Sequence, residues 1–189
     1  RSRGLGDVYK RQHLRDAPDA VAAGLTRITE NTVELITHLR GAGADGIFLA
    51  CQYATRNDLA LPVFQDYAMP PIRACLDAMA PAPLNMVHVH GAAIHSEPFA
   101  RLPGITVHYD MWAENPSPAG FLEAGCAVAT GPAPELLASY DPDDDVVKAC
   151  AALLDVGGRT ILSPGCSVPL AVGPGRLRLI SDAARRLHP

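Results

Sequence analysis

Five short apolar runs alternate with segments of helical periodicity along this chain, and this alternation most constrains the fold. The first run, Gly46-Ile47-Phe48-Leu49-Ala50-Cys51, has the composition of a strand buried on both faces. It follows a segment from Pro18 to Leu39 in which apolar residues recur at helical spacing. The other predicted strands are Asn85–His90, Ile105–Tyr109, Cys126–Thr130 and Arg159–Ser163. Because each helix carries the chain back to the same edge, the pattern predicts a parallel sheet.

The segments between the strands carry helix signals. Helical spacing from Pro62 to Met79 is interrupted by Pro70-Pro71, because proline lacks a backbone donor. Shorter or later helices are predicted near Ala119–Ala124 and from about Gly175 to Leu187. Another helix is predicted to begin at Asp143, Asp144 and Asp145, whose negative charges suit the positive end of a helix dipole. This helix is predicted to end at Gly157-Gly158.

Two parallel architectures fit this pattern. A doubly wound sheet is expected to place a phosphate-binding Gly-x-Gly-x-x-Gly motif after a strand, and none follows the predicted strands. An eight-stranded α/β barrel usually needs about 250 residues, and this chain has 189. We therefore predict an α/β fold that forms a partial (β/α)8 TIM barrel of about five C-terminal βα units, over residues 13–189. Residues 1–12 hold four of the sixteen basic residues without amphipathic period, and are predicted to be a non-native or disordered leader.

Composition excludes several function classes. The net charge of −4 provides no broad basic surface, which argues against a nucleic-acid partner. No apolar run approaches the roughly 20 residues of a membrane span, and no secretory signal pattern is present, so we predict a cytoplasmic protein without a membrane partner. The five cysteines are odd in number and widely spaced, which predicts reduced and mostly buried thiols.

Three metal-binding side chains lie at predicted strand ends. His88 and His90 are two residues apart, so on an extended strand both rings project from one face. Cys166 follows the fifth strand within Ser163-Pro164-Gly165-Cys166. Because the C-terminal strand ends of a barrel converge on the active site, these groups predict a zinc site with one open position. The alternative is two hydrogen-bonded histidines in a polar pocket and an inert packing cysteine.

Other polar residues follow the same strand ends. On the third strand, alternation places Thr106, His108 and Asp110 on one side, and we predict catalytic roles for His108 and Asp110. A helix cap or loop turn is the alternative for Asp110. Gln52 and Tyr53 directly follow the first strand, and with Trp112 they are candidates for substrate binding, although Trp112 could instead cover the core.

Several ordered motifs resemble the uroporphyrinogen decarboxylase superfamily over about residues 18–187. They are Gly43–Ala50, Phe64–Pro70, Val87-His88-Val89-His90-Gly91 and Ser163-Pro164-Gly165-Cys166 before a final helix. The resemblance implies a single (β/α)8 barrel, of which this chain would form the later strands.

The superfamily contains two branches that imply different chemistry. The zinc-dependent methyltransferases carry His-x-Cys-Gly where this chain has His88-Val89-His90-Gly91, and a cysteine where it has Cys166. Similarity to this branch implies Zn²⁺ and methyl transfer from a corrinoid, with a corrinoid protein as partner, or from another methyl donor to a thiol. The decarboxylases carry a histidine at the position of Cys166 and a serine near Gln52. Similarity to them implies metal-free decarboxylation of the tetrapyrrole uroporphyrinogen in haem biosynthesis.

The number of strands raises a third possibility. Five strands of eight cannot close a barrel, so two sheet edges and part of the inner face would stay exposed. The chain would then be inactive alone unless another chain, such as a second copy in a homodimer, covered them.

Overall fold

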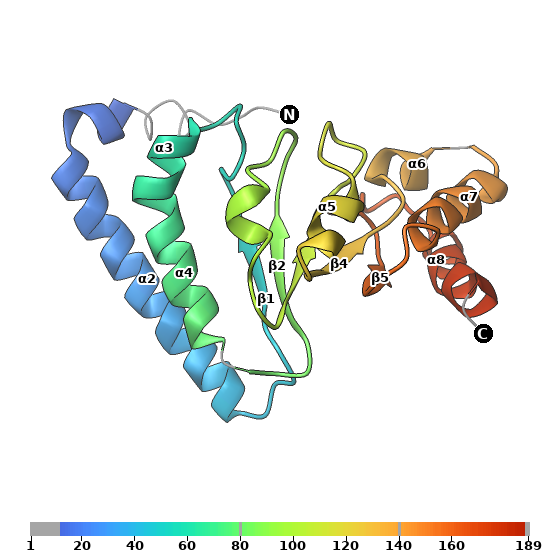
Figure 1. The fold of residues 1–189 in the computed structure, drawn as a ribbon, viewed down its shortest axis with the longest axis horizontal. Coiled ribbons are helices and arrows are strands. Elements are labelled where there is room, and N and C mark those ends of the chain that lie inside the picture. The colour runs from blue at the N-terminus through green and yellow to red at the C-terminus, as the bar shows by residue number, and fades with distance from the viewer. Residues whose placement is uncertain (1–11, 80, 140, 188–189) are drawn as a thin grey trace.

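The computed structural model describes residues 12–79, 81–139 and 141–187, and its centre is a five-stranded parallel sheet (Figure 1). The strands follow one another in the order β1-β2-β3-β4-β5. This order lacks the reversal of a doubly wound sheet and is that of a barrel wall, which confirms the predicted partial α/β barrel. Every predicted strand is present with bounds that differ by at most two residues. The strands are β1 (Phe48–Cys51), β2 (Asn85–Val89), β3 (Ile105–His108), β4 (Ala127–Thr130) and β5 (Thr160–Leu162).

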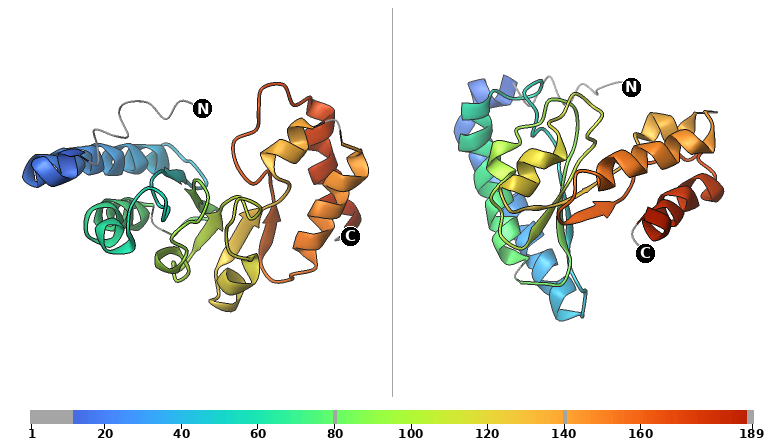
Figure 2. Two further views of the ribbon diagram at one scale, coloured as in Figure 1. Left: turned by 90° about the horizontal axis from the view of Figure 1, so that it is seen from above. Right: turned by 45° about the vertical axis from the view of Figure 1, so that its right-hand side comes forward.

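Helices cover the outer face of the sheet (Figure 2). The predicted ones are α2 (Pro18–Gly41), α4 (Met69–Ala78), α5 (Pro118–Glu123), α7 (Asp143–Leu154) and α8 (Pro174–Leu187). The short α3 (Leu61–Val63) begins the segment that was predicted as helical from Pro62 to Met79. The pattern did not indicate η2 (Glu97–Phe99) and α6 (Pro134–Ala138), because elements of three to five residues carry no measurable period. The predicted leader lies outside the described residues except for Gln12, which begins a helical segment at 12–16.

The two faces of the sheet differ in burial. Side chains on the helical side, such as Val87, Val107 and Val128, are fully buried in the core. On the inner side Ala50 is exposed and Phe48 is 57% exposed. The first strand was predicted to be buried on both faces, and the structure differs because no described segment covers the inner face of β1.

A π-helical turn, η1 (Phe64–Ala68), accounts for the proline pair in the second helical segment. The amide of Met69 donates to the carbonyl of Phe64, five residues earlier, instead of four. A proline ring collides with the carbonyl four residues before it in a regular helix, and a wider turn provides room for that carbonyl. Pro70 and Pro71 then lie in the first turn of α4, where no intrahelical donor is needed.

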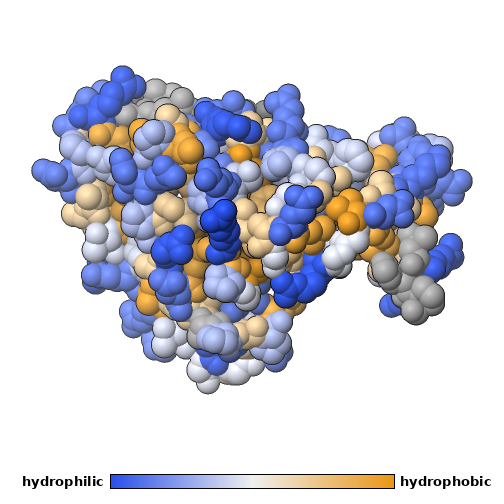
Figure 3. Space-filling model, in the orientation of Figure 1, coloured by the Kyte–Doolittle hydropathy of each residue, from blue (hydrophilic) through white to orange (hydrophobic). Residues whose placement is uncertain are grey.

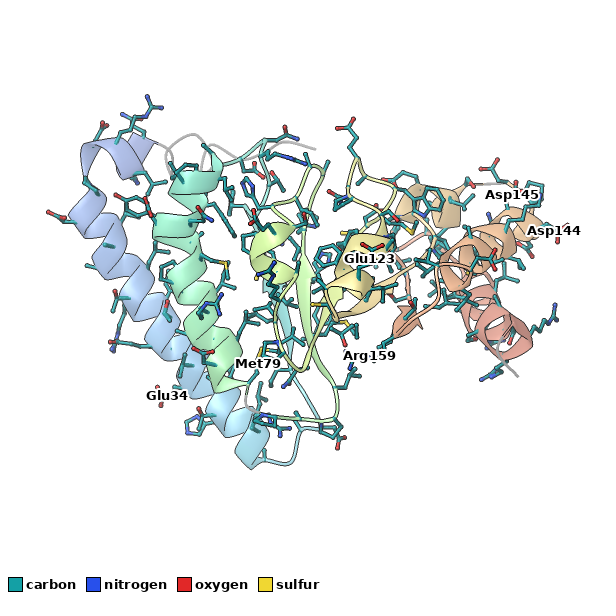
Figure 4. All side chains as sticks on the ribbon, in the orientation of Figure 1. Glu34, Met79, Glu123, Asp144, Asp145 and Arg159 are labelled. Carbon is teal, nitrogen blue, oxygen red and sulfur yellow. The ribbon has the colours of Figure 1, made fainter. Side chains whose placement is uncertain are left out.

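Apolar contacts form two clusters. The larger lies between the sheet and the helices α2, α4 and α5, and the smaller joins Val146 and Cys150 of α7 to Ile180 of α8. In the first turn of α7, Asp144 is exposed and Asp145 is partly exposed (Figure 4), and carboxylates there interact favourably with the helix dipole. Apolar side chains also show at the surface between the N-terminal helix pair and the C-terminal helices (Figure 3).

All five cysteines are free, and only Cys166 is not buried. Within the described part of the chain, no helix combines the length and the apolar character that a membrane crossing requires.

Close approach of two loops should make Gly46 the least replaceable glycine before β1. A Cβ atom there would lie 1.6 Å from the carbonyl oxygen of Leu84, which is backbone and cannot rotate away. Gly46→Ala should therefore lower the free energy of unfolding by about 1–3 kcal/mol or more, measured by urea denaturation. Gly24→Ala is the matched control: nothing lies within 4 Å of its Cβ, and alanine in a helix should raise stability by roughly 0.5–1 kcal/mol. Equal effects of the two substitutions would contradict the steric explanation.

Candidate metal centre

Three side chains from two segments that are distant in the sequence converge at the C-terminal edge of the sheet. His88 is in β2, His90 follows its last residue, and Cys166 lies in the loop after β5. The Sγ of Cys166 lies 3.2 Å from Nδ1 of His90 and 3.6 Å from Nε2 of His88. One ligand atom from each residue lies within 4.8 Å of the other two, so the group could hold a metal ion.

These separations fit a tetrahedral ion. Bond lengths of about 2.0–2.1 Å to nitrogen and about 2.3 Å to sulfur place tetrahedral nitrogen and sulfur ligands about 3.5 Å apart. The two sulfur–nitrogen distances of 3.2 and 3.6 Å lie on either side of this value. Two imidazoles and one thiolate form a zinc donor set that leaves one tetrahedral position for another ligand.

Glycines allow the loops to approach. Gly91, two residues after β2, has a φ of 105°, and a Cβ there would meet the side chain of Thr55 at 2.8 Å. A Cβ on Gly165 would lie 3.0 Å from both Cα and Oδ1 of Asp110. The backbone that carries the sulfur therefore packs directly against the end of β3.

Asn115 links the loops after β2 and β3. Its side-chain amide donates to the carbonyls of Gly91 and Asp110, at 2.8 and 2.7 Å, and its Oδ1 accepts from the amide of Ile94. Because Gly91 directly follows His90, these bonds restrict the position of a potential ligand histidine. Sequence reasoning did not select Asn115, and an asparagine in a polar loop gives no signal of such contacts.

A cavity of about 540 Å³ opens beside this group, and His90 and Cys166 line it. Gln52 and Tyr53, two of the predicted substrate-binding residues, line it, and so does Asp110. Tyr53 has a φ of 59°, a strained conformation for a side chain of this size. The lining also includes two carboxylates that sequence reasoning missed, Asp58 and Glu135, although both follow strand ends, which is the available signal.

The structure does not place Trp112 among the residues that line this cavity. Its side chain is 50% exposed, and its Nε1 donates to the carbonyl of Gly131. Its backbone amide donates to Oδ1 of Asp110 at 3.0 Å. Trp112 therefore holds the carboxylate of Asp110 and connects the loops after β3 and β4.

His108 lies beneath the cavity, beside His88. The two side chains are 7% exposed, and the two Nδ1 atoms are 2.8 Å apart. Nε2 of His108 donates to the carbonyl of Pro164 at 2.9 Å. The structure thus brings His88, His90, His108 and Cys166 into one connected group.

Burial shifts the pKa of two of these imidazoles. Burial first, and the neighbouring imidazoles of His108 and His90 second, together lower the pKa of His88 to about 4. Burial also lowers the pKa of His108, against opposing effects of the Pro164 carbonyl and Asp110. The pKa of Asp110 is raised, mainly by burial, while the amide of Trp112 opposes this shift. Neutral imidazoles have lone pairs for a metal, whereas protonated ones do not.

The metal-free protein should become less stable as the pH is lowered, because of His88. Its imidazole takes up a proton below about pH 6.5 in the unfolded chain but only near pH 4 in the folded protein. Unfolding therefore binds a proton in this window, and the free energy of unfolding should decrease as pH falls through it, by on the order of 3 kcal/mol from this ring. Urea denaturation of the wild type and His88→Gln should show a weaker dependence in the variant. His38→Gln, at an exposed position of α2, controls for loss of an imidazole. A wild-type slope in His88→Gln would contradict the assignment.

Comparison with solved structures supports the architecture. A methyltransferase from Methanosarcina mazei superposes with a TM-score of 0.79 at 14% sequence identity, over 95% of this chain and 53% of the methyltransferase. At this low sequence identity, the structural similarity is evidence for the fold alone. This chain spans about half the length of that protein. Curated protein sequences gave no significant match.

A protein-family model provides the assignment. The model described as uroporphyrinogen decarboxylase (URO-D) matches residues 8–187, which is nearly the whole chain. This range contains β1 to β5, the three potential metal ligands and the cavity beside them. The chain therefore belongs to the uroporphyrinogen decarboxylase family.

Proposed function

We propose that this chain carries the zinc site of a methyltransferase that acts on a thiol. The observation that supports this most is the convergence of His88, His90 and Cys166 at tetrahedral spacing beside an open cavity. Bound by these residues, Zn²⁺ would lower the pKa of a substrate thiol and so favour the nucleophilic thiolate at neutral pH. The methyl donor would be a corrinoid, delivered by a corrinoid protein, or another methyl compound.

Asp110 is suited to receive the proton of the thiol. Its carboxylate borders the cavity, packs against the segment that carries Cys166, and has a raised pKa. In the proposed step the S–H bond breaks and the proton passes to the carboxylate of Asp110. The sulfur then forms a bond to the methyl carbon as the bond from that carbon to the donor breaks, and the donor keeps the electron pair.

Charge in the cavity favours this proposal over decarboxylation of uroporphyrinogen. Asp58, Asp110 and Glu135 line the cavity, and none of its described lining residues is a lysine or arginine. A tetrapyrrole with acetate and propionate arms is a polyanion and would be repelled by this wall. A decarboxylase site would also have no use for the convergent sulfur of Cys166.

A second proposal is that the chain binds zinc but is inactive alone. Phe48 lies near the site, with its ring 6.0 Å from that of His88, yet is 57% exposed. The methyltransferase of known structure has about twice the aligned length. Further strands, from the same or another chain, would then complete the wall opposite β1 and contribute to substrate binding.

Zinc binding should depend on Cys166 and not on the other thiols. Cys166→Ser should weaken zinc affinity by on the order of 100-fold or more, because a hydroxyl is a poor substitute for a thiolate. Cys126→Ser is the matched control, since Cys126 is buried and its Sγ donates to the carbonyl of Ala100, as a serine can. Affinity is measured by competition with a chromophoric chelator. Wild-type protein that is folded but binds far less than one zinc per chain would exclude the proposed function.

Methyl transfer should depend on Asp110. With zinc-loaded protein, a small thiol and a methyl corrinoid, Asp110→Asn should form thioether about 10–100-fold more slowly than wild type, because the proton acceptor is lost. Glu123→Gln, on the surface of α5 away from the cavity (Figure 4), should match the wild type. Product is quantified by mass spectrometry. Thioether formation by wild type excludes the second proposal, whereas zinc binding without thioether supports it.

A further inference from the structure

Through its two ring nitrogens, His108 contacts one potential ligand and the loop that carries another. It is the register partner of His88 on the adjacent strand, and Nδ1 of one ring lies 2.8 Å from Nδ1 of the other. Its Nε2 contacts the carbonyl of Pro164 at 2.9 Å. Pro164 lies two residues before Cys166, so His108 touches both the imidazole on β2 and the loop that carries the sulfur.

The direction of these hydrogen bonds follows from the donors and acceptors available. A carbonyl oxygen only accepts, so Nε2 of His108 carries a proton and donates to Pro164. In a neutral imidazole the other nitrogen is then an acceptor, so Nδ1 of His108 accepts from Nδ1–H of His88. The remaining nitrogen of His88, Nε2, has a free lone pair and faces the Sγ of Cys166 at 3.6 Å.

We propose that His108 is a positioning residue that selects the Nδ1–H tautomer of His88 and orients its Nε2 lone pair toward the metal position. This inference rests on the proposed metal site. The chain from the Pro164 carbonyl through His108 to His88 fixes one ligand ring by the same contacts that hold the sulfur loop. A partner on the second nitrogen of a ligand histidine typically changes metal affinity 10–100-fold.

Packing is the competing explanation for His108. The ring is buried, and Phe48 lies against it at a centroid distance of 5.5 Å. A packing role depends on ring volume and not on which nitrogen accepts. Substitutions that preserve one polar contact at a time therefore separate the two explanations.

Asparagine and glutamine provide such a pair. The side-chain oxygen of asparagine can occupy the position of Nδ1 and accept from His88, whereas the amide of glutamine can occupy the position of Nε2 and donate to Pro164. We expect His108→Asn to bind zinc within about threefold of wild type, and His108→Gln to bind at least about tenfold more weakly. His108→Phe, which preserves volume without either contact, should resemble His108→Gln. Equal losses of zinc affinity in His108→Asn and His108→Gln would overturn the assignment. Wild-type zinc affinity in His108→Gln and His108→Phe would overturn it as well.

The tautomer itself can be measured without a variant or a metal. Nitrogen-15 NMR of the imidazoles in the metal-free, full wild-type chain should show His88 protonated at Nδ1 and unprotonated at Nε2. An Nε2–H tautomer would overturn the proposal even where a His108 variant fails to fold. If wild type binds no zinc but shows the Nδ1–H tautomer, the proposed function fails and the hydrogen-bond assignment stands. If wild type binds zinc and the tautomer is Nε2–H, only the assignment fails.

Discussion

The register of β2 against β3 is the constraint on which the site depends. His88 pairs with His108, so both rings lie on the inner face while Val87, Val89 and Val107 fill the core on the other. Side chains alternate with a period of two, and a slip of one residue would exchange these faces and bury the imidazoles among the helices. The fully buried valines therefore fix the positions of the histidines, because the hydrophobic core cannot accept the alternative register.

Sequence patterns predicted the elements that have a period of their own. The strands were located within two residues, and the common face of His88 and His90 followed from alternation alone. The position of Cys166 also followed from a general rule, since strand ends of a parallel barrel converge. The exposure of Phe48 could not be predicted from the sequence, because a strand sequence shows how apolar a face is and not whether another segment covers it.

Details of the site depend on contacts that no local pattern encodes. The carbonyl of Pro164 accepts a hydrogen bond from His108, which is 56 positions away in the sequence, and the side-chain amide of Asn115 joins two loops through their backbone carbonyls. Tyr53 and Glu114 adopt positive φ, which sequence disfavours and loop packing imposes. Trp112 illustrates the same limit: its position beside Asp110 was evident from sequence, but the direction of its indole toward Gly131 was not.

Electrostatics links the ligand set to the wall of the cavity. Two neutral imidazoles and one thiolate would leave a bound divalent ion with one uncompensated positive charge, whereas a set with a second thiolate in place of His90 would be neutral. Asp58, Asp110 and Glu135 line the same cavity and supply negative charge at longer range. In the proposed site, this charge in the wall would stabilise a cationic centre without occupying its fourth position, and Asp110 would in addition exchange a proton. A histidine at position 90 and an acidic wall are therefore mutually consistent parts of one site.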